Sequence, residues 1–176
     1  MKAIIVYESE YGSTKKYAEW IAAELGCDSV DSKSADVKEL ANYQAIILGS
    51  CIHGGTVPVV ELLKSYPVLL EDRKIALFAV GMPPYGSDYL AELQQSISEQ
   101  VGADIPLFYM RGALDLAKMS QQHQEIFKML EQKFSEKPLA ERSGLEQSII
   151  EACQKDGPSD WMSKEQIKPL LDWATA

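Results

Sequence analysis

Hydroxyl side chains surround a glycine directly after the first apolar run of the sequence. Ser9, Ser13 and Thr14 flank Gly12. Because glycine lets backbone N–H groups approach a ligand and a helix N-terminus carries positive dipole character, this pattern favours a single phosphate group. The segment has no basic residue before Lys15 and no GxxxxGK[ST] pattern, which argues against a nucleoside triphosphate with magnesium. The alternative is that Ser13 or Thr14 only caps a helix.

Two later segments have the composition of ligand-binding loops. Residues 49–58 contain two adjacent glycines beside His53, and residues 81–87 place a Pro-Pro pair before Tyr85. Adjacent glycines allow the backbone to contact a flat ligand, and a rigidly held aromatic ring can stack on a planar heterocycle. We take Tyr85 as the first candidate for stacking and Tyr11 as the second. The candidate binding residues are Ser9, Glu10, Tyr11, Gly12, Ser13, Thr14, Ser50, Cys51, Ile52, His53, Gly54, Gly55, Gly81, Met82, Pro83, Tyr85 and Gly86.

Few single residues of the chain suggest catalysis. His53 could exchange protons with a bound ligand because its reference pKa lies near neutrality, but an exposed loop histidine is the simpler interpretation. Cys51 fits a thiol that fills space at a strand end. Asp115 fits a helix cap, and His123 falls on the polar side of its expected helix without an evident chemical role. We therefore assign no catalytic residue, with His53 a weak candidate.

Alternating apolar runs and helical stripes predict the elements that position these loops. Short apolar runs predict buried strands, and the intervening segments repeat apolar residues with helical period. This alternation predicts an α/β fold: a three-layer, doubly wound, five-stranded parallel sheet of order 2-1-3-4-5, in which ligands bind beyond the carboxyl ends of the strands. The expected strands are 3–7, 27–31 (the weakest), 45–49, 75–81 and 107–111, and the expected helices are 14–25, 58–66, 88–101 and 120–134.

The chain continues beyond the fifth expected strand for longer than the fold requires. We expect one domain over residues 1–176, with an extra helical segment at about 135–161 and a helix at 144–155 within it. A final helix is expected to begin near Ser163 and to be kinked or restarted by Pro169. The extra segment fits either a solvated spacer or a surface for a partner or substrate.

The composition narrows the functional class. The 176 residues carry a net charge of −9, which lacks the basic footprint of a nucleic-acid-binding protein. We expect no membrane span, because no apolar stretch is long enough. The three cysteines offer neither a disulfide framework nor a CxxC pair, so we expect no structural metal and a cytoplasmic location.

The first loop resembles the phosphate-binding loop of flavodoxin-like proteins. Their pattern [ST]-x-T-G-x-T is matched at Ser9, Gly12 and Thr14, whereas Tyr11 stands where the family has Thr. The resemblance covers residues 1–112 well and implies FMN as the cofactor, held through its phosphate by this loop. It also implies electron exchange with a redox partner protein or with a small-molecule donor or acceptor.

Within that superfamily the chain looks most like the branch that includes the menaquinone-dependent protoporphyrinogen dehydrogenases. The shared segments are residues 47–55, 111–114 and 160–161, although this chain lacks the branch's long basic insert and basic late helix. We therefore expect an FMN-binding electron-transfer protein. The alternative is an FMN-dependent oxidoreductase similar to protoporphyrinogen IX dehydrogenase of haem biosynthesis, and whether the protein is a carrier or an enzyme stays open.

Two other interpretations of the same fold receive less support. A phosphoacceptor module needs a carboxylate at the end of the third strand, where Gly49-Ser50 stands. A family member without cofactor is suggested only by Tyr11. If FMN binds, Glu8 and Glu10 place negative charge beside the first loop, and this charge is expected to disfavour an anionic reduced flavin and to lower its potential.

Overall fold

A five-stranded parallel sheet forms the centre of the protein in a computed structural model that describes residues 2–85 and 88–176. Its strands pair in the order β2-β1-β3-β4-β5, all parallel, which confirms the predicted α/β fold and its strand order. Each expected apolar run is a strand, including the weakest one. The strands are β1 (Ala3–Glu8), β2 (Asp28–Asp31), β3 (Ala45–Cys51), β4 (Lys74–Gly81) and β5 (Leu107–Arg111).

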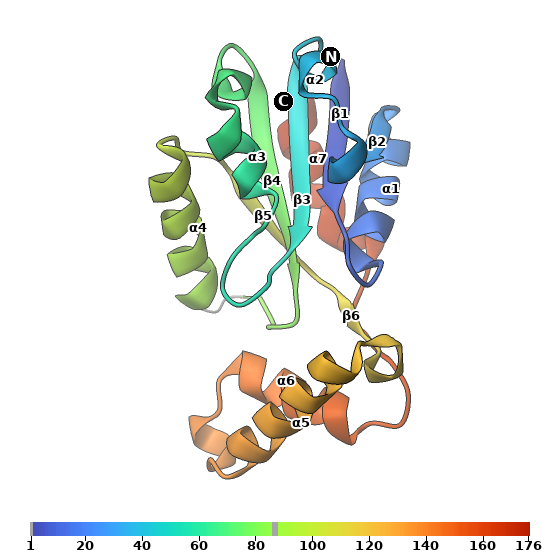
Figure 1. Cartoon of the computed structure of the whole chain (residues 1–176), viewed down its shortest axis with the longest axis vertical. Coiled ribbons are helices and arrows are strands. Elements are labelled where there is room, and N and C mark those ends of the chain that lie inside the picture. Colours follow the sequence, from blue (N-terminus) through green and yellow to red (C-terminus); the bar gives the residue numbers. More distant parts are fainter. Residues whose placement is uncertain (1, 86–87) are drawn as a thin grey trace.

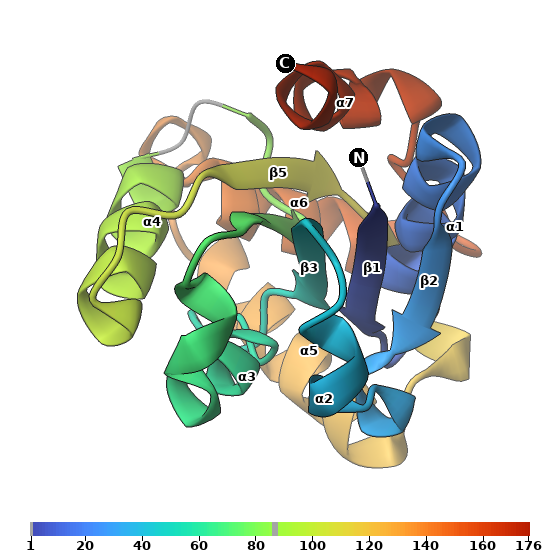
Figure 2. The ribbon, with the colours of Figure 1, turned by 90° about the horizontal axis from the view of Figure 1, so that it is seen from above.

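Helices cover both faces of this sheet (Figures 1 and 2). They include α1 (Ser13–Leu25), α2 (Val37–Leu40), α3 (Val60–Ser65), α4 (Asp88–Val101) and α7 (Lys168–Thr175), with 3₁₀ turns at Ser32–Ser34 and Pro67–Leu70. Helix α3 is shorter than the expected 58–66, since Pro58 and Val59 lie in a turn before it. The four-residue α2 was not predicted, because one helical turn carries too few residues to show a period.

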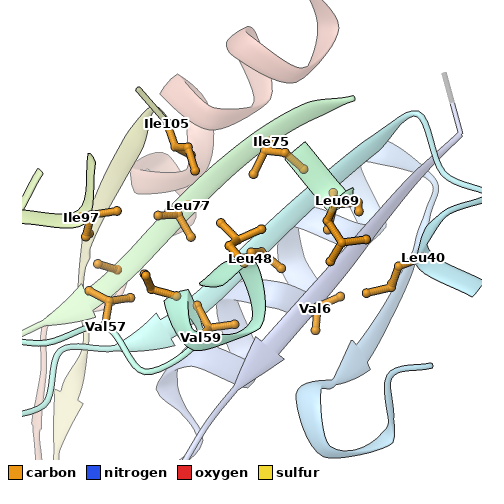
Figure 3. Close-up of a cluster of buried hydrophobic side chains, with 14 of the residues drawn as sticks. Val6, Leu40, Leu48, Val57, Val59, Leu69, Ile75, Leu77, Ile97 and Ile105 are labelled. Carbon is orange, nitrogen blue, oxygen red and sulfur yellow. The ribbon is translucent and has the colours of Figure 1, made fainter. Parts of the chain in front are cut away.

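Alternate residues of β1 divide the core into two halves. Ile4 and Val6 pack into the cluster under α3 and α4, part of which Figure 3 shows. Ile5 and Tyr7 pack into the cluster with α1 and α7. Successive side chains of a strand point to opposite faces, so a strand buried on both faces must be apolar throughout. This requirement explains why the central strands appear in the sequence as continuous apolar runs.

The chain leaves the sheet after β5 and returns before its last helix. We name residues 113–160 the cap; its elements are β6 (Ala113–Leu114), η3 (Leu116–Lys118), α5 (Gln121–Ser135), η4 (Leu139–Glu141), α6 (Gly144–Gln154) and β7 (Ser159–Asp160). Strands β6 and β7 pair antiparallel and close the cap at its base. Figure 1 shows α5 and α6 beyond the edge at which the parallel strands end.

The extra segment expected at about 135–161 therefore starts earlier in the structure. Helix α5 belongs to the cap, and α7 packs on the sheet as the helix that follows the fifth strand. The difference has a physical reason, since the apolar stripe of a helix is the same whether it packs on a sheet or over a cavity. A 3₁₀ turn at Lys164–Ile167 precedes α7, and Pro169 lies in the first turn of α7, so the chain restarts a helix there.

Candidate functional site

A cavity of about 550 Å³ lies between the carboxyl edge of the sheet and the cap. Its volume is in the range of small-molecule and cofactor sites, and its place at the ends of parallel strands is where such sites form. It is lined by Ser9, Glu10, Tyr11, Ser13, Thr14, Cys51, Ile52, His53, Gly54, Gly55, Val80, Gly81, Met82, Pro83, Tyr89, Gly112, Ala113, Leu114, Met119, His123, Ile126, Phe127, Leu130, Leu145 and Ile149.

The first loop turns sharply into α1. Gly12 has a φ of 96°, a left-handed conformation that side chains rarely adopt, and it is the N-cap residue of α1. The Oγ of Ser9 accepts a hydrogen bond from the Gly12 N–H at 3.1 Å, and no side-chain bond caps the helix. The hydroxyls of Ser13 and Thr14 are therefore not helix caps, and the first N–H groups of α1 lack intrahelical acceptors. This arrangement suits a phosphate group.

The second loop is a tight turn with two left-handed glycines. Gly54 and Gly55 have φ values of 55° and 84°. Backbone hydrogen bonds in both directions join His53 and Thr56, so the turn holds a fixed shape at the cavity wall. Burial, followed by the charge of Glu10, raises the pKa of Cys51, which makes its thiol a poor nucleophile.

The third loop separates the predicted aromatic residue from the cavity. Gly81, Met82 and Pro83 line the cavity, and the Tyr109 hydroxyl donates to the Pro83 carbonyl at 2.6 Å. Tyr85 is absent from the lining, and its hydroxyl donates instead to Oε1 of Gln166 at 3.0 Å. Tyr11 does line the cavity, while Gly86 lies outside the described residues.

Most of the other predicted residues come together at the cavity. Of the sixteen candidates within the described residues, Gly12, Ser50 and Tyr85 do not line it. Gly12 shapes the first loop instead, and Ser50 is fully buried with its hydroxyl donating to the Cys51 carbonyl. The role of each residue toward a ligand stays a prediction.

A polar cluster at the cavity joins both loops to the cap. The carboxylate of Glu10 lies 3.9 Å from Nδ1 of His53 and 3.7 Å from Nδ1 of His123, and the two imidazole rings are 5.8 Å apart. The Tyr11 hydroxyl is hydrogen-bonded to the same nitrogen of His123. His123 was not among the predicted site residues, because helical periodicity places it on a polar face without indicating what that face contacts. No group of metal-ligating side chains converges within the described part of the chain.

The cap contributes an apolar wall that the sequence analysis did not assign to the site. Ile126, Phe127 and Leu130 of α5 face the cavity together with Leu145 and Ile149 of α6. Helix α5 has no fully buried side chain, and Ile126 is 39% exposed. The apolar stripe of residues 126–134 was the available signal, but the stripe alone does not reveal that it covers a cavity.

The side chain of Arg111 connects the cap to the loop after β4. Its Nε donates to the Met82 carbonyl at 3.0 Å and its Nη2 to Oγ of Ser148 at 3.2 Å, while its guanidinium lies 4.7 Å from the ring centroid of Trp161. At the base of the cap, the Trp161 N–H donates to the Gly112 carbonyl at 3.1 Å. One side chain therefore contacts the third loop, α6 and the returning end of the chain.

A comparison with protein families identifies the kind of domain. The model of the family described as "Flavodoxin domain" matches residues 4–138. No curated protein sequence matches the chain. Oxidised flavodoxin 2 from Bacillus cereus is 25% identical with a TM-score of 0.47, over 63% of this chain and 84% of that one. A flavoprotein from Lactobacillus acidophilus NCFM in complex with FMN is 18% identical with a TM-score of 0.43, over 62% and 91%.

Proposed function

The chain belongs to the flavodoxin domain family, and on that premise we propose that it is an FMN-binding redox protein that transfers electrons through a non-covalent flavin. The observation that carries the proposal is the left-handed turn at Gly12, which opens the N-terminus of α1 beside a cavity. Such a turn offers unpaired N–H groups to a phosphate without a lysine or arginine.

The residues present fit FMN. The position where Gly12 would carry a Cβ has no atom within 4 Å, so a ligand can approach the backbone there. The hydroxyls of Ser9, Ser13 and Thr14 surround the same turn and would hold the phosphate, while the second and third loops supply largely apolar walls for the ring. Tyr11, which replaces the family's Thr, keeps a hydroxyl at the site but directs it to His123.

Bound FMN would supply one- or two-electron transfer, and the chain's own residues would set its environment. Apolar cap side chains line one side of the cavity, and an apolar surrounding strengthens electrostatic interactions. The carboxylate of Glu10 disfavours added negative charge and so is expected to lower the reduction potential. His53 and His123 line the cavity, where their ring nitrogens would form hydrogen bonds with a ligand.

The cap favours the second candidate, an FMN-dependent oxidoreductase. A carrier needs an exposed cofactor edge for its protein partner, whereas α5 and α6 lie over the edge at which the cavity opens. A small-molecule donor or acceptor therefore suits the site better than a redox partner protein. Similarity to the protoporphyrinogen IX dehydrogenases is one form of this alternative.

The three free thiols support a cytoplasmic location. Separately, no helix in the described ranges has the length and apolarity to cross a bilayer.

The visible absorption spectrum of the natively purified protein tests the proposal. We expect a bound-flavin spectrum, or its appearance when FMN is added to colourless protein, with one FMN bound per chain. Reduction with dithionite and reoxidation should then be reversible. A folded protein that neither carries nor perturbs FMN would overturn the proposal.

A further inference from the structure

We propose that the cap half of the cavity binds a flat, uncharged, mainly apolar small molecule beside the flavin. The inference rests on the proposed function and adds the chemical class of the molecule that the site receives. Three features of the structure carry it: the exposed apolar stripe of α5, the absence of basic side chains from the described cavity lining, and the clustering of polar groups at one side.

The apolar stripe of α5 is only partly covered by the rest of the protein. Ile126, Phe127 and Leu130 point their apolar surface at the cavity, yet no side chain of this 15-residue helix is fully buried. Burying one such side chain contributes about 1.5–3 kcal/mol, so a stripe left open in a folded domain indicates an occupant. The stripe lines a cavity of about 550 Å³, a volume in the range of small-molecule sites.

The charges at the cavity disfavour a negatively charged occupant. The described lining contains no Lys or Arg, while Glu10 adds a carboxylate and the chain carries a net charge of −9. A carboxylate-bearing ligand would lose water at the apolar wall without gaining a cation, which is costly. The phosphate of FMN avoids this cost at the N-terminus of α1.

The polar groups at the cavity predict how the occupant is oriented. Glu10, Tyr11, His53 and His123 gather where both loops meet α5, and the five wall residues of α5 and α6 are all apolar. A molecule with a single polar edge would direct that edge toward the histidines and its apolar body toward the cap. A flat shape of the occupant is expected because a flat molecule would stack on the ring of bound FMN.

Equilibrium dialysis of the FMN-loaded protein against naphthol tests this inference. Naphthol is a flat, uncharged aromatic alcohol, and the naphthalene carboxylate is its charged counterpart. We expect one naphthol to bind per chain and the carboxylate to bind at least about tenfold more weakly. Leu130→Gln should weaken naphthol binding about tenfold, because it places an amide in the apolar wall.

Met129→Gln is the matched control. Met129 lies on the same helix, is 62% exposed and does not line the cavity, so this variant should bind naphthol within twofold of the parent. FMN affinity, measured by flavin fluorescence, should stay within twofold of the parent in Met129→Gln. Ile126→Asn provides a second wall variant if Leu130→Gln folds poorly.

Each outcome decides between the two proposals. An FMN-loaded protein that binds no naphthol, binds both probes equally, or loses binding equally in both glutamine variants overturns the inference while FMN binding stands. In that case the flavin alone covers the wall. A folded protein that binds no FMN overturns the proposed function instead, and with it this inference.

Discussion

Arg111→Met is expected to release the cap without unfolding the sheet. The variant keeps an apolar stem against Trp161 but loses the bonds to the Met82 carbonyl and to Ser148, together with the cation–π contact. Hydrogen bonds from a charged donor contribute about 1.5–3 kcal/mol each, so the two bonds alone amount to about 3 kcal/mol at the low end of that range. Opening of the cap should therefore become roughly 100-fold more frequent.

Amide hydrogen exchange at the base of the cap measures this opening. The Trp161 N–H is bonded to the Gly112 carbonyl and the Ala113 N–H to Ser13 Oγ, so both amides should exchange roughly 100-fold faster. Amides of β3 should be unchanged. Arg142→Met is the control, since Arg142 bonds the carbonyls of Ser135 and Lys137 within the cap. Exchange at Trp161 less than threefold faster than in the parent would refute the role of Arg111.

Three further changes test the site and its scaffold. Gly12→Ala and Gly26→Ala each place a side chain at a left-handed backbone position, so each should cost about 1 kcal/mol of stability in urea unfolding. Only Gly12→Ala should weaken FMN binding. Equal FMN affinities of the two variants would contradict the role of the Gly12 turn in binding phosphate. Gly49→Ala should cost about 1–3 kcal/mol or more, because its Cβ would lie 1.9 Å from the buried Phe78 ring, and an unchanged denaturation midpoint would contradict that packing. Burial raises the pKa of Tyr17 to about 12, above the value near 10 of the unfolded chain, so its contribution to stability is complete below pH 10 and is lost as pH rises toward 12. Unfolding at pH 9 and 11.5 checks this, and a parent that loses no more stability than Tyr17→Phe over that interval would contradict it.

The sheet could be predicted from the sequence because its strands meet one simple condition. Residues 45–49 and 75–81 must be apolar on both faces, and hydropathy alone shows it. The turn of the first loop could be predicted for a similar reason, since Gly12 with neighbouring hydroxyls is typical of a turn in which backbone N–H groups face a ligand. The order of the strands followed from the alternation of elements and the family resemblance.

The cap and its residues could not be predicted in the same way. Helix α5 is amphipathic, as α1 and α4 are. Helical periodicity does not show which part of the protein the apolar stripe of a helix contacts. His123 meets Glu10 across more than a hundred residues of chain, a contact that no local pattern encodes. Tyr85 was predicted to stack on a ligand because the Pro-Pro pair before it indicates a rigid loop. Its hydroxyl instead donates to Gln166, a contact that the sequence pattern does not indicate.

The closed base of the cap makes it a removable part of the chain. Gly112 and Trp161 are already bonded to each other, and β6 pairs with β7, so the two ends of the segment lie side by side. A short turn joining residues 112 and 161 would leave both halves of the core intact, since neither contains a cap residue. Excision would uncover the cofactor edge and leave a smaller domain that large molecules can approach. In this protein, the size of the molecule that can reach the cavity would then depend on one excisable stretch of chain.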